Sequence, residues 1–469
     1  MHTMTASKNV YDVIVVGAGL SGLQAAQVIQ AAGFTVCVLE ATNRVGGKTL
    51  TVKSSEKGYN DLGAAWINDT NQSEMFKLFQ KYGLDTEVQY ASGDTIFHLA
   101  DGSLDKVPYG QISGDPELFL ELVGILRTES SSVDLDDPLK SHNSVEIDQL
   151  TFKDLCVQRT HNEQARRIAD LISTALLGVD SNEVSALYML HYFKSGCGID
   201  NLLSDGKDGG QYLRNRQGNQ TISKKLAEEL GSRSVFLSKP VASVDQLGGC
   251  HGVVAVTQSG ESFYGRKAII SVPTTLYPSI TFSPPLPAKK TALSDNTVMG
   301  YYSKTVFVFK DPWWRTAGLS GIIDSEVGPI SFTRDTSIPA DDQWSITCFI
   351  VGERGRQWSK LSKAARHKQA WEQFSHTFGK YVKGIPEPTN SLEMEWAKQA
   401  YFLGAPCPVM TPGILTTVGT ELTTPFGDVH FVGTETATVW RGYMEGAMRS
   451  GQRGGAEVVK KLADELSTR

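Results

Sequence analysis

Three glycines near the start of the chain have the spacing G-x-G-x-x-G, between an apolar run and a helical stretch. The run from Tyr11 to Val16 predicts a buried strand, and the predicted helix begins at Leu20. In such a turn Gly17 permits the tight bend, Gly19 lets backbone N–H groups approach a pyrophosphate, and Gly22 lets helix and strand pack closely. The helix N-terminus adds positive potential. These residues predict a dinucleotide-binding turn.

A carboxylate follows at the expected distance. The predicted strand from Thr35 to Leu39 is followed directly by Glu40. Strand, glycines, helix, second strand and acid occur in this order within about 30 residues, as in a dinucleotide-binding βαβ unit. Glu40 is therefore expected at a ribose 2′-hydroxyl, and its charge would repel a 2′-phosphate.

The residues after the acid separate two cofactors. Arg44, Gly46 and Gly47 form an RxGG segment, which resembles the second signature of the large FAD-binding family that includes glutathione reductase and the amine oxidases. Lys48 stands where that family usually has arginine, so the charge is kept but a planar bidentate phosphate contact is lost. The resemblance implies FAD rather than NAD.

Lys304 interrupts YYSKTVFVF, a predicted strand whose other residues are mostly apolar or aromatic. Burying an ammonium is costly unless it is paired. The strand alone leaves three alternatives: an ion pair, a snorkelled position at a surface edge, or a functional site bridged by water.

The composition narrows the class of protein. With 469 residues, 40% hydrophobic and 20% charged, the chain is expected to form two or three globular domains. A net charge of −6 and the lack of a basic cluster argue against nucleic acid as a partner. The six cysteines show no CxxC or Cys/His spacing, so neither disulfides nor a metal site are expected.

Localisation is predicted from what the sequence lacks. There is no apolar leader and no run of about 18 apolar residues, which argues against a signal peptide and a transmembrane helix. The end of the chain, ADELSTR, carries no membrane anchor and does not match a peroxisomal SKL signal. We therefore expect an intracellular, cytoplasmic protein, and a homodimer is compatible with the sequence.

Several longer segments closely resemble the flavin-containing monoamine oxidases. They are DLGAAW (61–66), EVSALY (183–188), FSPPLP (282–287), TPGILT (411–416) and the C-terminal GTETATVWRGYMEGAMRSGQRGG. The resemblance implies a mixed α/β amine oxidase fold. A Rossmann-like FAD-binding domain of the glutathione reductase type is expected at residues 1–84, 211–294 and 396–469. It includes a meander at about 234–272, and an inserted substrate-binding domain is expected at 85–210 and 295–395.

The resemblance also implies roles for single residues. Lys304 matches the lysine that faces flavin N5 through a water, and Tyr443 matches one of two rings that flank the amine. Trp396 matches a tryptophan that packs near the flavin, and Gln211 a glutamine that lines the substrate cavity.

Three further matches concern the cofactor. Glu435 matches the acid near the ribityl and phosphate part of FAD, and Val241 the residue whose backbone holds the adenine. Met444 matches the residue whose N–H points at flavin O2, where a helix N-terminus stabilises negative charge.

Two departures from the family alter the expected site. Ala405 stands where the mammalian enzymes have the cysteine that bonds covalently to the flavin, and Cys407 lies two residues off that position. The expectation is therefore FAD held without a covalent bond. Pro406 replaces the second cage ring, which predicts a half-open substrate site unless Phe402 fills the gap.

The expected reaction is oxidative deamination of a primary amine by hydride transfer to flavin N5. The products are an aldehyde or ketone, ammonia and hydrogen peroxide, with O2 as the acceptor. The open cage makes a long-chain amine such as fumonisin a specific hypothesis. Arg441 keeps open a polyamine or L-amino-acid oxidase, and a non-catalytic binding module on the same fold is the third alternative. His191, in an apolar helical segment, is interpreted as a core residue.

Overall fold

The computed structural model describes residues 9–247 and 252–467. The chain divides into two compact units, each built from segments far apart in sequence. The first comprises Met1–Lys48, Gln220–Thr297 and Val418–Arg469, and the second Thr49–Asn219 and Val298–Thr417. Residues 49–84, 211–219 and 396–417, which we expected in the FAD-binding domain, thus belong to the second unit, and residues 295–297 to the first. Strand pairing gives one reason, since β5 (Trp66–Ile67) is hydrogen-bonded to β9 (Leu213–Asn215).

The first unit is built on one sheet with the order β10-β2-β1-β13-β12-β11-β14, and β22 also pairs with β13. Strand β1 runs parallel to β2 and β13, whereas β13, β12 and β11 are successive antiparallel neighbours, as the meander predicted. The first turn of that meander, at residues 248–251, lies outside the described residues. The strands are β1 (Asn9–Val16), β2 (Val36–Leu39), β10 (Val235–Phe236), β11 (Val241–Gln246), β12 (Val253–Thr257), β13 (Ser262–Ile270), β14 (Thr281–Ser283) and β22 (Val429–Phe431).

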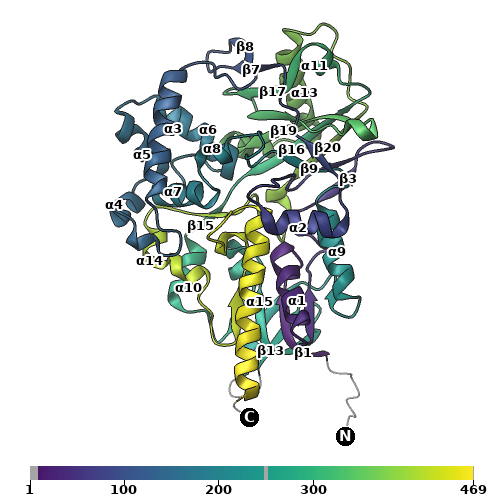
Figure 1. The fold of residues 1–469 in the computed structure, drawn as a ribbon, viewed down its shortest axis with the longest axis vertical. Helices are drawn as coiled ribbons and strands as arrows, with labels where there is room; N and C mark the ends of the chain where they lie inside the picture. The colour runs from purple at the N-terminus through teal and green to yellow at the C-terminus, as the bar shows by residue number, and fades with distance from the viewer. Residues whose placement is uncertain (1–8, 248–251, 468–469) are drawn as a thin grey trace. The chain divides into compact units, whose positions relative to one another are not determined.

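Helices α1 (Leu20–Ala31) and α15 (Met444–Ser467) lie side by side in this unit (Figure 1). Glycines on α15 make the close approach possible. A Cβ on Gly451 would lie 2.4 Å from the backbone oxygen of Ser21, and one on Gly455 would lie 2.8 Å from Cβ of Val28. The C-terminal helix is therefore fixed against the helix that begins at the glycine turn. Helices α9 (Gln220–Leu230) and α10 (Ala288–Asp295) complete the unit.

The second unit contains a seven-stranded sheet with the order β20-β16-β19-β18-β17-β7-β8. One face packs against α13 (Lys363–Gly379) through an aromatic core that includes Phe307, Phe309 and Phe374. Side chains alternate between the two faces of a strand, so Lys304, Phe349 and Phe332 lie on the other face. The strands are β7 (Asp94–His98), β8 (Leu104–Pro108), β16 (Tyr302–Phe309), β17 (Leu319–Ser325), β18 (Phe332–Asp335), β19 (Trp344–Val351) and β20 (Asn390–Glu395).

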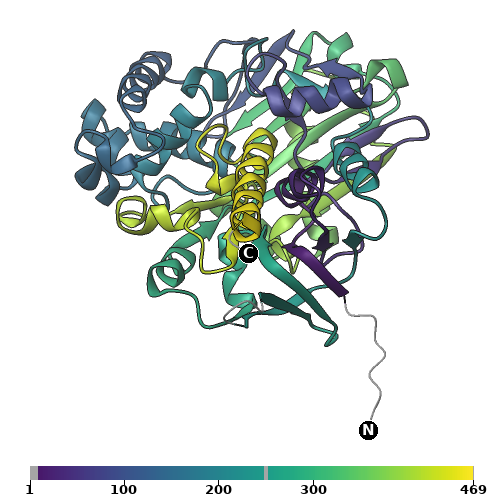
Figure 2. The same ribbon diagram turned by 60° about the horizontal axis from the view of Figure 1, so that its bottom comes forward.

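The segment from 116 to 202 is mainly helical, and its helices pack on one another (Figure 2). His191 is fully buried, and its ring nitrogen Nε2 lies 3.1 Å from the backbone oxygen of Leu135, which confirms it as a core residue. The helices are α3 (Pro116–Ser131), α4 (Ser144–Gln149), α5 (Phe152–Thr160), α6 (Ala165–Leu177), α7 (Ala186–Ser195) and α8 (Ile199–Leu202).

Within residues 9–247 and 252–467, no helix has both the length and the apolar character that crossing a bilayer requires. That part of the chain also holds no group of three or more His, Cys, Asp or Glu side chains arranged for a metal ion. The described cysteines, Cys37, Cys156, Cys197, Cys348 and Cys407, are free thiols. Cys250 lies outside the described residues.

Candidate functional site

The glycine turn forms as predicted between β1 and α1. Gly17 has φ +104°, a conformation that other residues rarely adopt, and its N–H donates to the Leu39 oxygen at 2.8 Å. A Cβ on Gly22 would lie 2.1 Å from the Gly17 oxygen, so only glycine fits there. Sequence and structure therefore agree on why these two positions are glycine.

Gly19 differs from these two, because a Cβ there would meet no atom of the described chain within 4 Å. It is the N-cap of α1, and neither a capping side chain nor an acidic residue in the first turn occupies the helix N-terminus. The first N–H groups of a helix have no partner within the helix and attract anions. The open position in front of them fits a pyrophosphate.

Glu40 lies beside this turn and is almost completely buried. Its carboxylate accepts hydrogen bonds from Ala18 N–H (2.8 Å) and Thr42 N–H (2.9 Å). The backbone N–H of Lys239 donates to the backbone oxygen of Glu40 at 2.8 Å, which brings the start of β11, Val241, into the same region. The predicted ribose and adenine residues are thus neighbours.

The RxGG segment folds over the glycine turn. The Gly46 N–H donates to the Ala18 oxygen at 2.8 Å, and Arg44 Nη2 donates to the Gly47 oxygen at 2.8 Å. A Cβ on Gly47 would lie 3.2 Å from Cα of Gly19. Arg44 and Gly47 therefore shape the loop beside the open position. The charge of Lys48, at the end of the segment, interacts with the Glu435 carboxyl.

The C-terminal segment brings three predicted residues together. Burial raises the pKa of Glu435, while Lys48 and Arg441 act in the opposite direction, and its carboxylate accepts the Thr274 N–H at 3.1 Å. The hydroxyl of Thr434 donates to the backbone oxygen of Tyr443 at 2.8 Å. The Tyr443 ring lies edge-on to the fully buried Trp440, 4.8 Å between centroids, and Met444 begins α15.

Arg441 is also buried, and its Nε donates to the backbone oxygen of Ala437 at 3.1 Å. Its hydrogen bond and its charge interaction with Glu435 both lie within the C-terminal part of the first unit. Neither contact supports the interpretation of Arg441 as a residue that binds an amino acid or a polyamine.

In the second unit, Lys304 is 5% exposed and stands on a strand between β19 and β20. The interpretation as a surface-edge lysine is therefore wrong. Its Nζ donates to the backbone oxygens of Asp61 (3.1 Å) and Gly63 (2.5 Å). An ammonium has three N–H groups, and among the described residues no third acceptor is present.

Trp396 is fixed by the same segment. Its Nε1 donates to the Leu62 oxygen at 3.0 Å, so three consecutive carbonyls, of residues 61 to 63, hold Lys304 and Trp396 together. Phe402 packs edge-on against Trp396 with 5.1 Å between centroids, in a cluster that includes Ala405. The DLGAAW motif thus acts through its backbone as well as its side chains.

The remaining predicted residues are Pro406, Cys407 and Gln211. Pro406 follows Ala405, whose N–H donates to the Gly300 oxygen at 2.9 Å, and Cys407 is fully buried. The Gln211 N–H donates to the Ser204 oxygen at 3.2 Å. In the part of the chain that the structure describes, Gln211 is not among the contacts of Lys304.

Asp61 forms a buried charge pair with Lys304. Burial raises the pKa of the Asp61 carboxyl to about 6, against hydrogen bonds from Thr51 and Asn219 and the charge of Lys304. Burial lowers the pKa of Lys304 to about 8, which the charge of Asp61 opposes and that of Arg214 reinforces. The charge of each group thus favours the ionised form of the other, against the effect of burial.

Asp61→Asn is expected to lower the pKa of Lys304 further, because the neutral amide no longer favours the ammonium. The rate of any step that needs protonated Lys304 should then fall as the pH rises, with a midpoint about one pH unit below that of the wild type. The measurement is the pH dependence of flavin reoxidation by O2 in stopped flow. An unshifted profile in Asp61→Asn would contradict the pairing.

Sequence reasoning missed an aromatic row beside Lys304. Lys304 is paired directly with Phe349 on β19, Phe349 with Phe332 on β18, and Phe332 with Asp324 on β17. Lys304 Nζ lies 5.3 Å from the Phe349 ring centroid, and the two phenyl rings stack 4.5 Å apart. Long-range strand pairing creates this row, and no local sequence signal reveals it.

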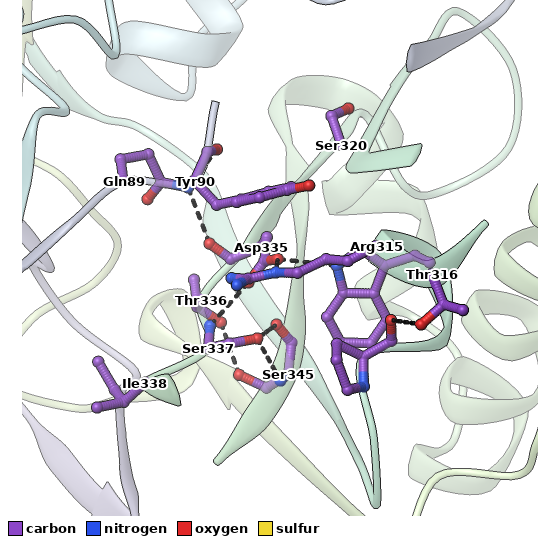
Figure 3. Close-up of polar contacts among 12 residues, drawn as sticks. Gln89, Tyr90, Arg315, Thr316, Ser320, Asp335, Thr336, Ser337, Ile338 and Ser345 are labelled. Atoms are coloured by element: carbon purple, nitrogen blue, oxygen red, sulfur yellow. Dashed lines mark hydrogen bonds and ion pairs between the residues drawn. The ribbon is translucent and has the colours of Figure 1, made fainter. Parts of the chain in front are cut away.

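Trp66 also flanks Lys304, 5.5 Å from Nζ to the ring centroid, and a polar network holds it. Its Nε1 donates to Gln89 Oε1 at 2.9 Å, and Gln89 Nε2 donates to the Asp335 backbone oxygen at 2.9 Å. Figure 3 shows the Arg315 side chain below the Tyr90 ring, 4.0 Å from its centroid, with Nε donating to the Asp335 carboxylate at 2.6 Å. This network rigidifies the wall of the site.

Comparisons with known proteins identify the family of the chain. The family model described as flavin containing amine oxidoreductase matches residues 20–459. The chain is 32% identical over 459 residues to flavin-containing amine oxidase B of Sus scrofa, covering 96% of this chain and 86% of that protein. It is 32% identical over 458 residues to a probable flavin-containing monoamine oxidase A of Dictyostelium discoideum, covering 96% and 98%.

Two solved structures share the fold. Cyclohexylamine oxidase from Brevibacterium oxydans matches with a TM-score of 0.89 at 29% identity, over 97% of this chain and 99% of that one. Wild-type putrescine oxidase bound to putrescine matches with a TM-score of 0.87 at 25% identity, over 96% and 99%. The chain therefore belongs to the flavin-containing amine oxidase family, with the mixed α/β fold and the FAD cofactor of that family.

Proposed function

We propose that the chain is a monoamine oxidase that converts primary amines to aldehydes or ketones, ammonia and hydrogen peroxide. FAD, when bound, accepts the hydride lost from the carbon next to nitrogen and passes the electrons to O2. The observation that carries the proposal is Lys304, a buried ammonium fixed by two backbone carbonyls with one N–H left over.

The first unit supplies the residues that would hold FAD. Gly17, Gly19 and Gly22 leave room in front of the α1 N-terminus for the pyrophosphate, and Glu40 offers a carboxylate for the ribose. Met444 begins α15, whose first N–H groups favour negative charge on a bound ring. These observations support binding without a covalent bond.

Lys304 would act through the third N–H of its ammonium. The two carbonyl contacts fix Nζ, so this N–H has a defined direction and can hold one water molecule. A positive charge in a water-poor site favours negative charge that develops next to it. Lys304 thus orients a water and stabilises charge during electron transfer.

Aromatic rings would favour the neutral amine, the form whose lone pair assists hydride loss. Phe349 and Trp66 flank Lys304, and Phe332 stacks on Phe349. An apolar surrounding lowers the pKa of an amine by disfavouring its charged form. Tyr443 would contribute a further ring to amine binding.

A diamine or polyamine oxidase is the second candidate function. Two carboxylates, Asp205 and Asp324, interact with Arg334 near the end of the aromatic row. A long-chain amine such as fumonisin falls within the primary-amine proposal, and its chain would run along the same row.

A peroxidase-coupled assay for hydrogen peroxide tests the proposal across alkylamines, arylamines, polyamines, amino acids and long-chain amino-polyols. Primary monoamines are expected to yield peroxide and ammonia in equal amounts. A response to polyamines alone would favour the second candidate. The absence of peroxide with every amine, from protein that carries FAD, would refute both.

The FAD is expected to dissociate when the protein is denatured, because Ala405 has no thiol and Cys407 is fully buried two residues away. After acid precipitation the yellow colour should stay in the supernatant. Ala405→Cys is the matched variant, and part of its flavin is expected in the pellet. A yellow pellet from the wild-type protein would contradict the prediction.

A further inference from the structure

The aromatic row ends in a cluster of charged and polar side chains, Asp205, Asp324, Arg334 and Tyr109, which we call the distal cluster. Arg334 follows Phe332 by two residues, so both lie on the same face of β18, and its guanidinium lies 5.4 Å from the Phe332 ring centroid. Arg334 Nε lies 3.8 Å from the Asp205 carboxylate, and the Tyr109 hydroxyl donates to that carboxylate at 2.7 Å. All four residues belong to the second unit.

Hydrogen bonding in the distal cluster is incomplete. Among the described residues, none donates a hydrogen bond to the Asp324 carboxylate, although burial raises the pKa of that carboxyl. Arg334 Nη1 donates to the backbone oxygen of Thr333 at 2.9 Å, and within the described chain Nη2 has no acceptor. An acceptor and a donor whose charges interact are therefore each able to take a further partner.

The distal cluster carries charges of both signs. Arg334 interacts with the carboxyls of both Asp205 and Asp324, and burial raises the pKa of the Asp324 carboxyl. An ammonium placed here would be repelled by Arg334, and a carboxylate by Asp205 and Asp324. A hydroxyl can donate to Asp324 and accept from Arg334 at once, without either repulsion.

The two ends of the row differ in exposure. Lys304 is 5% exposed at one end, whereas the Arg334 side chain is 23% exposed at the other. From β16, which carries Lys304, to β18, which carries Arg334, there are two strand spacings, roughly 9.5 Å. An extended chain of about eight bonds covers a similar length, at ~3.4 Å per three bonds.

We propose that the distal cluster binds a hydroxyl group of the substrate, so that the enzyme prefers amines whose chain carries a hydroxyl about eight bonds from the nitrogen. The inference rests on the proposed function, because it places the reacting amine at the Lys304 end of the row. Phe332, which is partly exposed and stacks on the buried Phe349, would hold the apolar part of the chain. Asp324 and Arg334 would then be specificity residues.

The test compares octylamine with its ω-hydroxy, ω-amino and ω-carboxy derivatives by kcat/KM in the wild-type holoenzyme. A hydrogen bond to a charged group is strong enough to change kcat/KM about tenfold. We expect the hydroxy derivative to exceed octylamine by about this factor, and both charged derivatives to fall below octylamine. A wild-type preference for the ω-amino or ω-carboxy derivative, or equal use of octylamine and its hydroxy derivative, would overturn the proposal.

Two variants sharpen the test by neutralising one partner at a time. Asp324→Asn should improve use of the ω-carboxy derivative, and Arg334→Gln should improve use of the ω-amino derivative, while both lose the preference for hydroxyl. Arg127→Gln, which alters an exposed ion pair with Asp200, is the matched control and should keep the wild-type order. Unchanged orders in both test variants would refute the proposal. If neither octylamine nor any of its three derivatives yields peroxide, the proposed function fails instead.

Discussion

Lys304→Met is expected to slow flavin reduction or reoxidation about a hundredfold, the loss typical when one fixed electrostatic group is removed from an active site. Methionine keeps an unbranched chain of similar length beside Phe349 and Trp66, so the packing changes little. The substitution removes the ammonium, including the third N–H group that is proposed to hold a water molecule. Stopped-flow absorbance of the flavin measures both half-reactions separately.

Lys398→Met serves as the control, since that side chain is 47% exposed in the same unit and pairs with Glu395 at 2.9 Å. It should leave both half-reactions unchanged. Flavin occupancy of Lys304→Met is checked from the visible spectrum before any rate is compared. Wild-type rates in both half-reactions of Lys304→Met would remove Lys304 from the mechanism.

Two alanine substitutions in the glycine turn are expected to affect different properties, FAD affinity at Gly19 and the stability of the apoprotein at Gly22. At Gly19 a Cβ meets no atom of the chain and φ is −72°, so Gly19→Ala should leave the stability of the apoprotein unchanged. The methyl group would stand where a pyrophosphate approaches, and the affinity for FAD should fall about tenfold or more. At Gly22 the Cβ would clash with the Gly17 oxygen, which should destabilise the apoprotein by about 1–3 kcal/mol.

Thermal unfolding of the apoprotein and titration with FAD, followed by flavin fluorescence, separate these effects. Gly33→Ala is not a suitable control, because Gly33 has φ +87°. Gly379→Ala fits better, since Gly379 lies in α13 of the other unit and a Cβ there meets nothing within 4 Å. Normal FAD affinity in Gly19→Ala would place the pyrophosphate elsewhere.

The nucleotide-binding half of the fold could be predicted because its signals are local. The Gly17 turn, the strand before it and the acid after β2 follow one another within one βαβ unit, and each residue type has a steric or electrostatic reason. The meander was visible from alternating strands and turns. The boundaries of the units were harder, because the chain crosses from one unit to the other within continuous segments, as at Lys48 and Thr49.

The candidate site was only partly predictable. Lys304 was found because a lysine inside an apolar strand is unusual, but the strand alone could not exclude a surface edge. Its two acceptors are backbone oxygens some 240 residues earlier, and backbone groups leave no trace in the sequence. Phe349 and Phe332 look like ordinary strand residues until the register places them beside Lys304.

The most direct test of the central claim is anaerobic mixing of the FAD-loaded protein with a primary monoamine, followed by air. We expect the visible flavin absorbance to bleach with the amine, and to return with O2 as one equivalent of hydrogen peroxide appears. Flavin that stays oxidised with every amine tested, although the protein binds FAD, would contradict an amine oxidase.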